Sequence, residues 1–293
     1  MKPFSLKNYR VEIILFYVLA AAAMAVAAVY DLKIDIALND RSNVVANWFE
    51  VTGEMPLYLL VIAAFGVLTK CLKNKWLKGL CFVGTLGAGV YLGDFVARRL
   101  FADNAFRTVY GVVYGLGVSL LFLLALRFIP VPEKLVKPLI LMSLLGVVGC
   151  AVSSGIINLA KDVWGRVRFR DLEEGYGAFT AWYVINGSNG AHSFPSGHTG
   201  SAGMTYFLMF LPFVSEKWQK RTTLLFAAAF VYTTTVAATR LIMGAHYLSD
   251  VAVGGTVAFT CVLVSLSVYR KLLPRFTRGN ASPAPAVEAG EPE

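Results

Sequence analysis

Charged residues are scarce in this chain, and their scarcity argues against an ordinary soluble fold. Asp, Glu, Lys and Arg make up 15% of the 293 residues, and hydrophobic residues make up 57%. Soluble domains carry about 25% charged residues and about 45–50% apolar residues. The apolar excess lies in long runs, which is typical of a protein that spans a membrane.

Cysteine and histidine are also rare. The chain has three histidines, His192, His198 and His246, so the surroundings of each are informative. The four cysteines lie in or beside apolar runs without metal-binding spacing, and we interpret them as small buried hydrophobic side chains rather than a disulfide framework. They are Cys71, Cys81, Cys150 and Cys261.

The net charge of +9 does not indicate nucleic-acid binding, because the basic residues flank apolar runs and form no basic stripe. In membrane proteins Lys and Arg gather on cytoplasmic loops. Most of the 27 basic residues fall on one side of the membrane if the N-terminus is cytoplasmic. The sequence therefore predicts a multi-pass protein of the cell (inner) membrane with both termini in the cytoplasm.

Eight apolar runs have roughly the length of about 20 residues that a helix needs to cross the hydrocarbon core. They predict an all-α fold, a polytopic integral membrane helical bundle of about eight spans. The second run is short and the third carries Asp94, so these two are the weakest. The runs cover 11–30, 55–69, 79–97, 109–127, 137–159, 198–214, 222–239 and 250–269.

The domain organisation is simple. Residues 1–278 are expected to form a single membrane-embedded domain, and the Ala-, Pro- and Glu-rich residues 279–293 a disordered tail. The first apolar run exceeds the about 7–15 residues of a signal peptide, which favours a retained span. The polar loop 160–197 is expected to fold over the membrane surface.

One group of basic residues lies on the side that membrane proteins disfavour for positive charge. Such a cluster indicates an anionic ligand on the extracytoplasmic side. Its members are Lys161, Arg166, Arg168, Arg170 and Arg240.

A histidine and an aspartate four residues apart, His246 and Asp250, follow the seventh run. On a helix this spacing places both on one face. A carboxylate that binds one imidazole nitrogen fixes the tautomer and leaves the other nitrogen free to attack. Taken alone, the pair also fits an ordinary His–Asp contact at a helix start.

The segment Pro195-Ser196-Gly197-His198 begins the sixth run. Proline can set the turn into a helix and serine can cap it, while the free N–H groups and the helix dipole attract an anion. Glycine lets the anion approach the backbone. A helix start alone does not require His198, which could give a proton to a leaving oxygen.

A third segment supplies positive charge. Lys161 and Arg168 are seven residues apart, so both can face one side if the helix continues that far. Arginine and lysine side chains suit phosphate oxygens. For Arg166 and Arg170 we expect instead that the side chains extend to the lipid headgroups.

Together these segments contain the groups for phosphoryl transfer, with no metal required: a nucleophile, its orienting acid, a proton donor and several cations. They resemble the signatures of the type 2 phosphatidic acid phosphatase family, related to bacterial class A acid phosphatases and vanadium haloperoxidases. In that family the first arginine precedes a proline, here Phe169, and a serine precedes the last arginine, here Thr239. Neither difference removes a catalytic group.

The resemblance covers about residues 137–269 and implies a role for each matching residue. His246 attacks phosphorus, Asp250 orients it, and His198 protonates the leaving group. The resemblance also implies a six-span core preceded by two additional spans, and hydrolysis with neither metal nor cofactor. The residues that hold the phosphate are Lys161, Arg168, Ser196, Gly197 and Arg240.

The expected partners are a phosphorylated lipid and the bilayer, with the oligomeric state left open. Polyprenyl diphosphate, phosphatidic acid, phosphatidylglycerophosphate and lipid A are the substrate classes that the resemblance suggests. Two other functions remain open: a lipid phosphotransferase with the same phosphohistidine, and a non-catalytic transporter or lipid-binding protein. His192 is expected to be incidental, and Trp164, Phe179, Trp182 and Tyr183 to form an aromatic belt.

Overall fold

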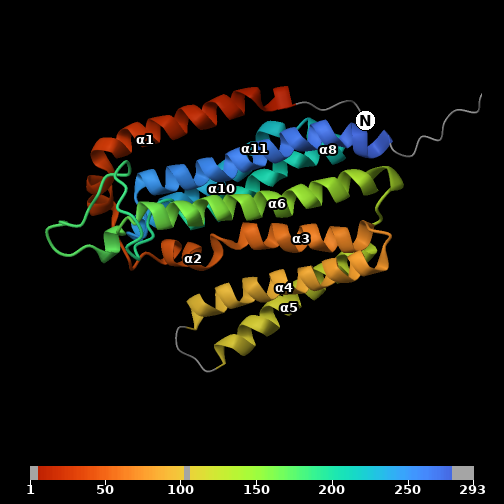
Figure 1. Cartoon of the computed structure of the whole chain (residues 1–293), viewed down its shortest axis with the longest axis horizontal. Helices are drawn as coiled ribbons and strands as arrows, with labels where there is room; N and C mark the ends of the chain where they lie inside the picture. The colour runs from red at the N-terminus through yellow and green to blue at the C-terminus, as the bar shows by residue number, and fades with distance from the viewer. Residues whose placement is uncertain (1–5, 102–105, 279–293) are drawn as a thin grey trace, which may run out of the picture.

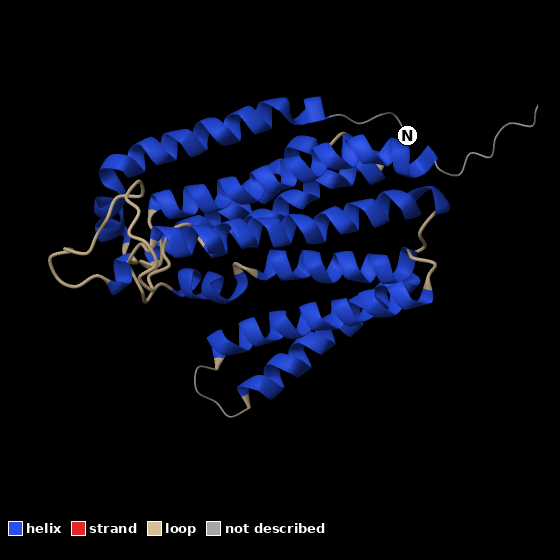
Figure 2. Cartoon of the chain, viewed as in Figure 1, coloured by secondary structure: helices blue, strands red, loops and turns tan. Residues whose placement is uncertain are grey.

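The apolar runs of the sequence form long helices that lie side by side. A computed structural model describes residues 6–101 and 106–278, so the predicted tail 279–293 lies outside the described residues. Within these ranges the chain contains helices and loops and no strand (Figure 2). The helices are η1 (Leu6–Tyr9), α1 (Arg10–Leu38), α2 (Val44–Thr52), α3 (Met55–Cys71), α4 (Lys75–Leu100), α5 (Arg107–Phe128), α6 (Glu133–Trp164), η2 (Phe169–Asp171), α7 (Gly197–Ala202), η3 (Gly203–Phe210), α8 (Leu211–Val214), α9 (Glu216–Gln219), α10 (Thr222–Ile242) and α11 (Leu248–Arg278).

The all-α membrane bundle predicted from the sequence is confirmed. Among the described residues, 7 helices are long and apolar enough to cross a membrane. Large apolar side chains cover the outward faces of the outer helices: Val11 and Val29 on α1 and Val113 and Leu121 on α5 are more than half exposed. A continuous apolar exterior suits hydrocarbon as the surrounding solvent.

The predicted span 198–214 is not among those 7 helices. The structure divides it into α7, η3 and α8, which follow one another without a break. The polar side chains of its first turns, His198, Thr199 and Ser201, lower its apolar character. It still runs from the loop end of the bundle toward the opposite end (Figure 1), and Tyr206 and Met209 are fully buried within it.

The peripheral helices are α4 and α5, at the edge of the bundle in Figure 1. They pack mainly against each other and against α3, whereas α1 packs against α11 and α3 against α6. Helices α1 and α3 therefore contact the helices that carry the motifs. Which spans are additional to the core stays a prediction. The number of apolar runs predicted additional spans, but it did not predict which helices lie at the edge of the bundle.

The long loop between α6 and α7 lies at one end of the bundle, and both described ends of the chain lie at the other (Figure 1). This arrangement places the loop-side ends of α6, α7, α10 and α11 near one another. The three motif segments are located at these ends.

The α4–α5 pair depends on glycine. A Cβ on Gly93 would lie 1.8 Å from the carbonyl oxygen of Gly111, and a Cβ on Gly115 would lie 2.0 Å from that of Gly89. On each helix the two glycines are four residues apart, the spacing that lets membrane helices approach closely.

Replacing Gly93 with valine is therefore expected to separate α4 from α5 and to lower thermal stability, since overpacking of this kind costs typically about 1–3 kcal/mol. Gly87→Val is the matched control on the same helix, because nothing lies within 4 Å of a Cβ at Gly87. The measurement is the thermal unfolding midpoint of each variant in detergent micelles. Equal midpoints for the two variants would contradict the close packing.

Candidate active site

The first motif segment leaves its helix before it reaches Arg168. Helix α6 ends at Trp164, and Gly165 follows with a φ of +50°. Only glycine fits at this turn, because a Cβ would lie 1.9 Å from the carbonyl oxygen of Gly187. The expectation that Lys161 and Arg168 share one helical face is therefore wrong, since Lys161 lies in the last turn of α6 and Arg168 lies in the loop.

The second segment joins the other two. Ser196 caps α7 as predicted, because its Oγ accepts a hydrogen bond from the N–H of Thr199 at 3.3 Å. The N–H of Ser196 donates to the carbonyl oxygen of Asp250 at 2.9 Å. A Cβ on Gly197 would lie 3.4 Å from Nζ of Lys161. Residues of all three motif segments therefore lie close together.

His246 and Asp250 form the third segment. His246 lies in the turn between α10 and α11 rather than on a helix, yet its Nδ1 lies 3.5 Å from Oδ2 of Asp250. This separation is long for a hydrogen bond, as is common at catalytic pairs before substrate binds. Both side chains are buried. Nε2 is the imidazole nitrogen that Asp250 leaves free.

The environment of His246 favours the neutral ring. Its pKa is lowered to about 4, mainly because burial disfavours the charged form. Lys161 and Arg168 act in the same direction, and Asp250 opposes them. At pH 7 the imidazole is neutral and retains the lone pair that a nucleophile needs.

Asp250 is held from several sides. Its Oδ1 accepts a hydrogen bond from Nη1 of Arg166 at 2.7 Å. Its Oδ2 accepts hydrogen bonds from the hydroxyl of Ser193 and, at 3.0 Å, from the N–H of Tyr247. The carboxylate is thereby fixed in place beside His246, which is the requirement for an orienting acid.

Arg166 is the centre of a buried ion-pair network. Its side chain is 0% exposed and donates to Asp31 at 2.9 Å, to Ser249 at 2.8 Å, to Asp250 at 2.7 Å and to the carbonyl oxygen of Thr180 at 2.9 Å. The expectation that this arginine extends to the lipid headgroups is wrong. Nothing in the sequence distinguished Arg166 from the nearby Arg170, whose side chain is only half-buried.

Asp31 is a site residue that sequence reasoning missed. It lies on α1, is 2% exposed, and accepts hydrogen bonds from the N–H of Ser249 at 3.0 Å and from the Ser249 hydroxyl. Asp31 pairs with Arg166, which in turn donates a hydrogen bond to Asp250. A sequence signal was present, because Asp31 directly follows the first apolar run, and an ionisable residue at membrane depth needs a partner inside the bundle.

The aromatic residues of the loop hold it against the bundle. Nε1 of Trp164 donates to the carbonyl oxygen of Trp182 at 2.6 Å, and the Trp164 ring stacks on Phe194 with centroids 5.0 Å apart. Phe179 lies 5.5 Å from the guanidinium of Arg166. Trp164 and Phe179 therefore pack inward, whereas Tyr183 is 62% exposed.

His198 has a carboxylate partner that the motifs do not contain. Its Nδ1 lies 2.9 Å from Oε1 of Glu54, between α2 and α3, and its Nε2 lies 3.4 Å from the carbonyl oxygen of Glu50. The Glu54 carboxylate also accepts from the Tyr58 hydroxyl at 3.4 Å and lies 3.9 Å from Arg99 of α4. Sequence reasoning missed these residues because nothing local in the sequence links them to His198.

Arg240 is fully buried and forms an ion pair with Glu50, and it donates to the carbonyl oxygen of Ala46 at 3.1 Å. Among the described residues, Nε of Arg240 and Nε of Arg168 are buried N–H groups without a hydrogen-bond partner. Such groups are free to donate to the oxygens of an anion.

A polar chamber of about 260 Å³ lies beside these residues, between α3, α6 and α7. Lys161, Glu54 and Gly197 line it, together with Tyr58 and Ser153. No group of three or more His, Cys, Asp and Glu side chains that could hold a metal ion occurs in residues 6–101 and 106–278. The charged groups that line the chamber are the side chains of Lys161 and Glu54.

His192, the remaining histidine, is exposed, unlike the buried His198 and His246. Its ring is 45% exposed, and its Nδ1 lies 3.7 Å from Asp162, whose side chain is 66% exposed. An exposed pair of this kind contributes little to stability or to a buried site.

Comparison with known proteins gives one match. No curated protein and no solved structure shows a significant match to the chain. Residues 140–274 match the family model described as the PAP2 superfamily. The matched segment contains all eight residues that the sequence motifs proposed for the site. This match covers slightly less than half of the chain and supports a PAP2-type phosphatase.

Proposed function

We propose that the protein removes phosphate from a lipid phosphomonoester or diphosphate by transferring the phosphoryl group first to His246 and then to water. The observation that carries this proposal is the buried, neutral His246 beside an Asp250 that is fixed by Arg166. Binding an anion does not require a neutral imidazole with an orienting carboxylate, whereas nucleophilic attack does.

The first step forms a bond between Nε2 of His246 and phosphorus, and breaks the bond between phosphorus and the leaving oxygen. His198 gives its proton to that oxygen. In the second step His198 takes a proton from water, the water oxygen attacks phosphorus, and the phosphorus–nitrogen bond breaks to release inorganic phosphate. The groups proposed to hold the phosphate oxygens are Lys161, Arg168, Arg240, Ser196 and Gly197.

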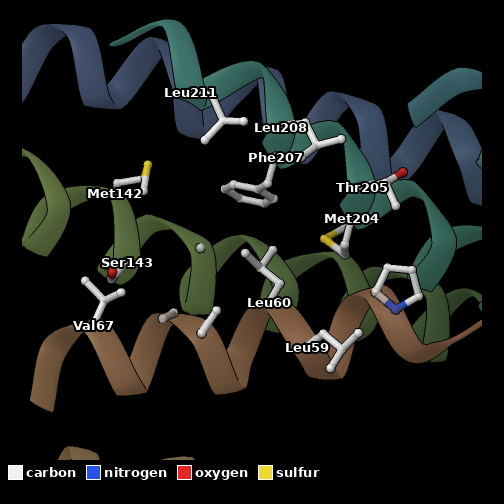
Figure 3. A pocket seen from close by; sticks show the side chains of 14 residues that line it. Leu59, Leu60, Val67, Met142, Ser143, Met204, Thr205, Phe207, Leu208 and Leu211 are labelled. Carbon is white, nitrogen blue, oxygen red and sulfur yellow. The ribbon is translucent and has the colours of Figure 1, made fainter. Parts of the chain in front are cut away.

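An apolar groove supports a lipid as the substrate. It has a volume of about 450 Å³ and lies between α3, α6 and η3. Figure 3 shows its lining, with Leu60 and Val67 from α3, Met142 from α6, and Phe207 and Leu208 from η3. Ligand sites that are mostly apolar with a few convergent polar groups suit amphiphilic molecules.

The groove continues the polar chamber along α3 and α6, and η3, which follows α7 directly, forms its third side. Leu57 and Ser201 line the chamber, while Leu60 and Met204, each three residues further on, line the groove. Residues three apart on a helix are neighbours on one face. A phosphate held by Lys161 and Gly197 at the chamber would therefore direct an attached chain into the groove.

The proposed location follows from the distribution of positive charge. Both termini are in the cytoplasm of a bacterial-type cell (inner) membrane, and the active site faces the extracytoplasmic side. The substrate is polyprenyl diphosphate, phosphatidic acid, phosphatidylglycerophosphate or a lipid A-like molecule, all of which combine a phosphate with apolar chains.

Replacing His246 with alanine is expected to abolish phosphate release, because the nucleophile is lost while the bundle is kept. His192→Ala is the matched control and should retain wild-type turnover, since His192 lies in an exposed pair with Asp162. The assay is release of inorganic phosphate from the four lipid classes in detergent micelles, together with trapping of acid-labile phosphohistidine. Phosphate release by the His246 variant at the wild-type rate would falsify the mechanism.

Replacing Leu60 with tryptophan is expected to fill the groove and to raise KM for long-chain phosphatidic acid about tenfold or more, since each buried methylene contributes about 0.8 kcal/mol. KM for a dihexanoyl analogue should change little. Leu121→Trp, on the 68% exposed outer face of α5, is the control. Equal effects on both chain lengths would argue against the groove as the chain-binding site.

A cysteine introduced at Tyr183, which is 62% exposed in the α6–α7 loop, is expected to react with a membrane-impermeant maleimide in intact cells. The four native cysteines are buried and should give little background. Labelling that occurs only after the cells are opened would reverse the proposed orientation.

A further inference from the structure

The residues around His198 accept hydrogen bonds but donate none to it. The carboxylate of Glu54 faces Nδ1 at 2.9 Å, and the carbonyl oxygen of Glu50 faces Nε2 at 3.4 Å. A carbonyl or carboxylate oxygen has no proton to give. The short contact therefore requires a proton on Nδ1, which donates to Glu54 and fixes the orientation of the ring.

Glu54 is itself held in place. Gly53 separates α2 from α3, and a Cβ there would lie 2.7 Å from the carbonyl oxygen of Phe49, so the chain turns closely at this position. The Tyr58 hydroxyl, one turn along α3, donates to the Glu54 carboxylate at 3.4 Å. Arg99 of α4 lies 3.9 Å from the same carboxylate.

We propose that Glu54 is a positioning residue that orients the His198 ring through Nδ1, so that Nε2 delivers its proton to the leaving oxygen of the phosphate ester. This inference rests on the proposed function and names a determinant of its proton-donating step that lies outside residues 140–274. The leaving oxygen gains the proton as its bond to phosphorus breaks, and His198 regains a proton from the attacking water. Glu54 stays ionised throughout and touches neither substrate nor phosphorus.

Charged groups surround His198. Glu50 and Glu54 lie on one side, Arg99 lies beyond Glu54, and Lys161 lies near Gly197. The closest of these groups to the ring is the Glu54 carboxylate at 2.9 Å. Removing this carboxylate removes the acceptor that fixes the ring through Nδ1, so the direction of Nε2 is no longer held.

Replacing Glu54 with glutamine tests the inference through the leaving group. Phosphate esters with a poor leaving group, such as an alkyl alcohol, need a proton from His198, whereas p-nitrophenyl phosphate does not. In the Glu54→Gln variant we expect kcat for an alkyl phosphate to fall about 100-fold or more, and kcat for p-nitrophenyl phosphate to fall less than about fivefold.

Glu50→Gln is the matched control, because the Glu50 side chain pairs with Arg240 and Arg99 and contacts His198 only through its backbone oxygen. This variant should alter KM for all esters alike. Glu54→Asp, which keeps the carboxylate, should restore part of the lost kcat. An equal loss of kcat for both leaving groups would overturn the role of Glu54.

Phosphohistidine trapping separates this inference from the proposed function. Glu54→Gln should still accumulate the phosphorylated enzyme from p-nitrophenyl phosphate, because His246 and Asp250 are intact. A wild-type enzyme that hydrolyses both esters without any phosphohistidine would overturn the proposed mechanism and the role of Glu54 with it. Thermal unfolding of each variant shows whether a loss of kcat is due to misfolding. If the Glu54→Gln variant does not fold, kcat of the Glu54→Asp variant is compared with that of the wild type instead.

Discussion

The site depends on one buried arginine. Arg166 connects Asp31 of α1 with Asp250 of α11, and all three side chains are at most 2% exposed. Charges can remain this deeply buried only when they are paired and hydrogen-bonded, and removing one partner of such a pair costs about 3–5 kcal/mol. The network therefore ties the first helix, the loop after α6 and the last helix together at one end of the bundle. The orientation of His246 follows from that connection, because Asp250 is the residue beside it.

The two proposed catalytic histidines differ in their surroundings, and the difference matches their roles. Burial lowers the pKa of His246, the nearby Lys161 and Arg168 act in the same direction, and the nucleophile stays neutral. His198 faces the oxygens of Glu54 and Glu50, which suit a ring that carries an extra proton. Opposite environments for two titratable groups are the usual means by which one site holds both a base and an acid. Here the difference comes from helices on opposite sides of the site: α10 and α11 position His246, while α2 and α3 position the partners of His198.

Sequence alone predicted the helical membrane bundle and the convergence of the three motif segments, because apolar length and fixed residue spacing are local properties. It placed Lys161 and Arg168 on one helical face, which is wrong because Gly165 ends α6 between them. It assigned Arg166 to the membrane surface, since neither the partner on α1 nor the one on α11 is near it in sequence. Glu54 lies more than a hundred residues before His198 and carries no motif. Long-range partners of this kind become visible only when the fold brings the helices together.

The helical segment that begins with Gly197 has a consequence for how the protein is made. Unlike the other long helices, this segment is not apolar enough by composition to qualify as a membrane span. The translocation machinery recognises spans largely by their apolarity, so this segment depends on its neighbours to stay within the bilayer. Its contacts with α10 and α11, which are synthesised later, couple the position of His198 to completion of the chain. A truncated product would leave His198 without a stable position, and the catalytic machinery forms only in a fully inserted molecule.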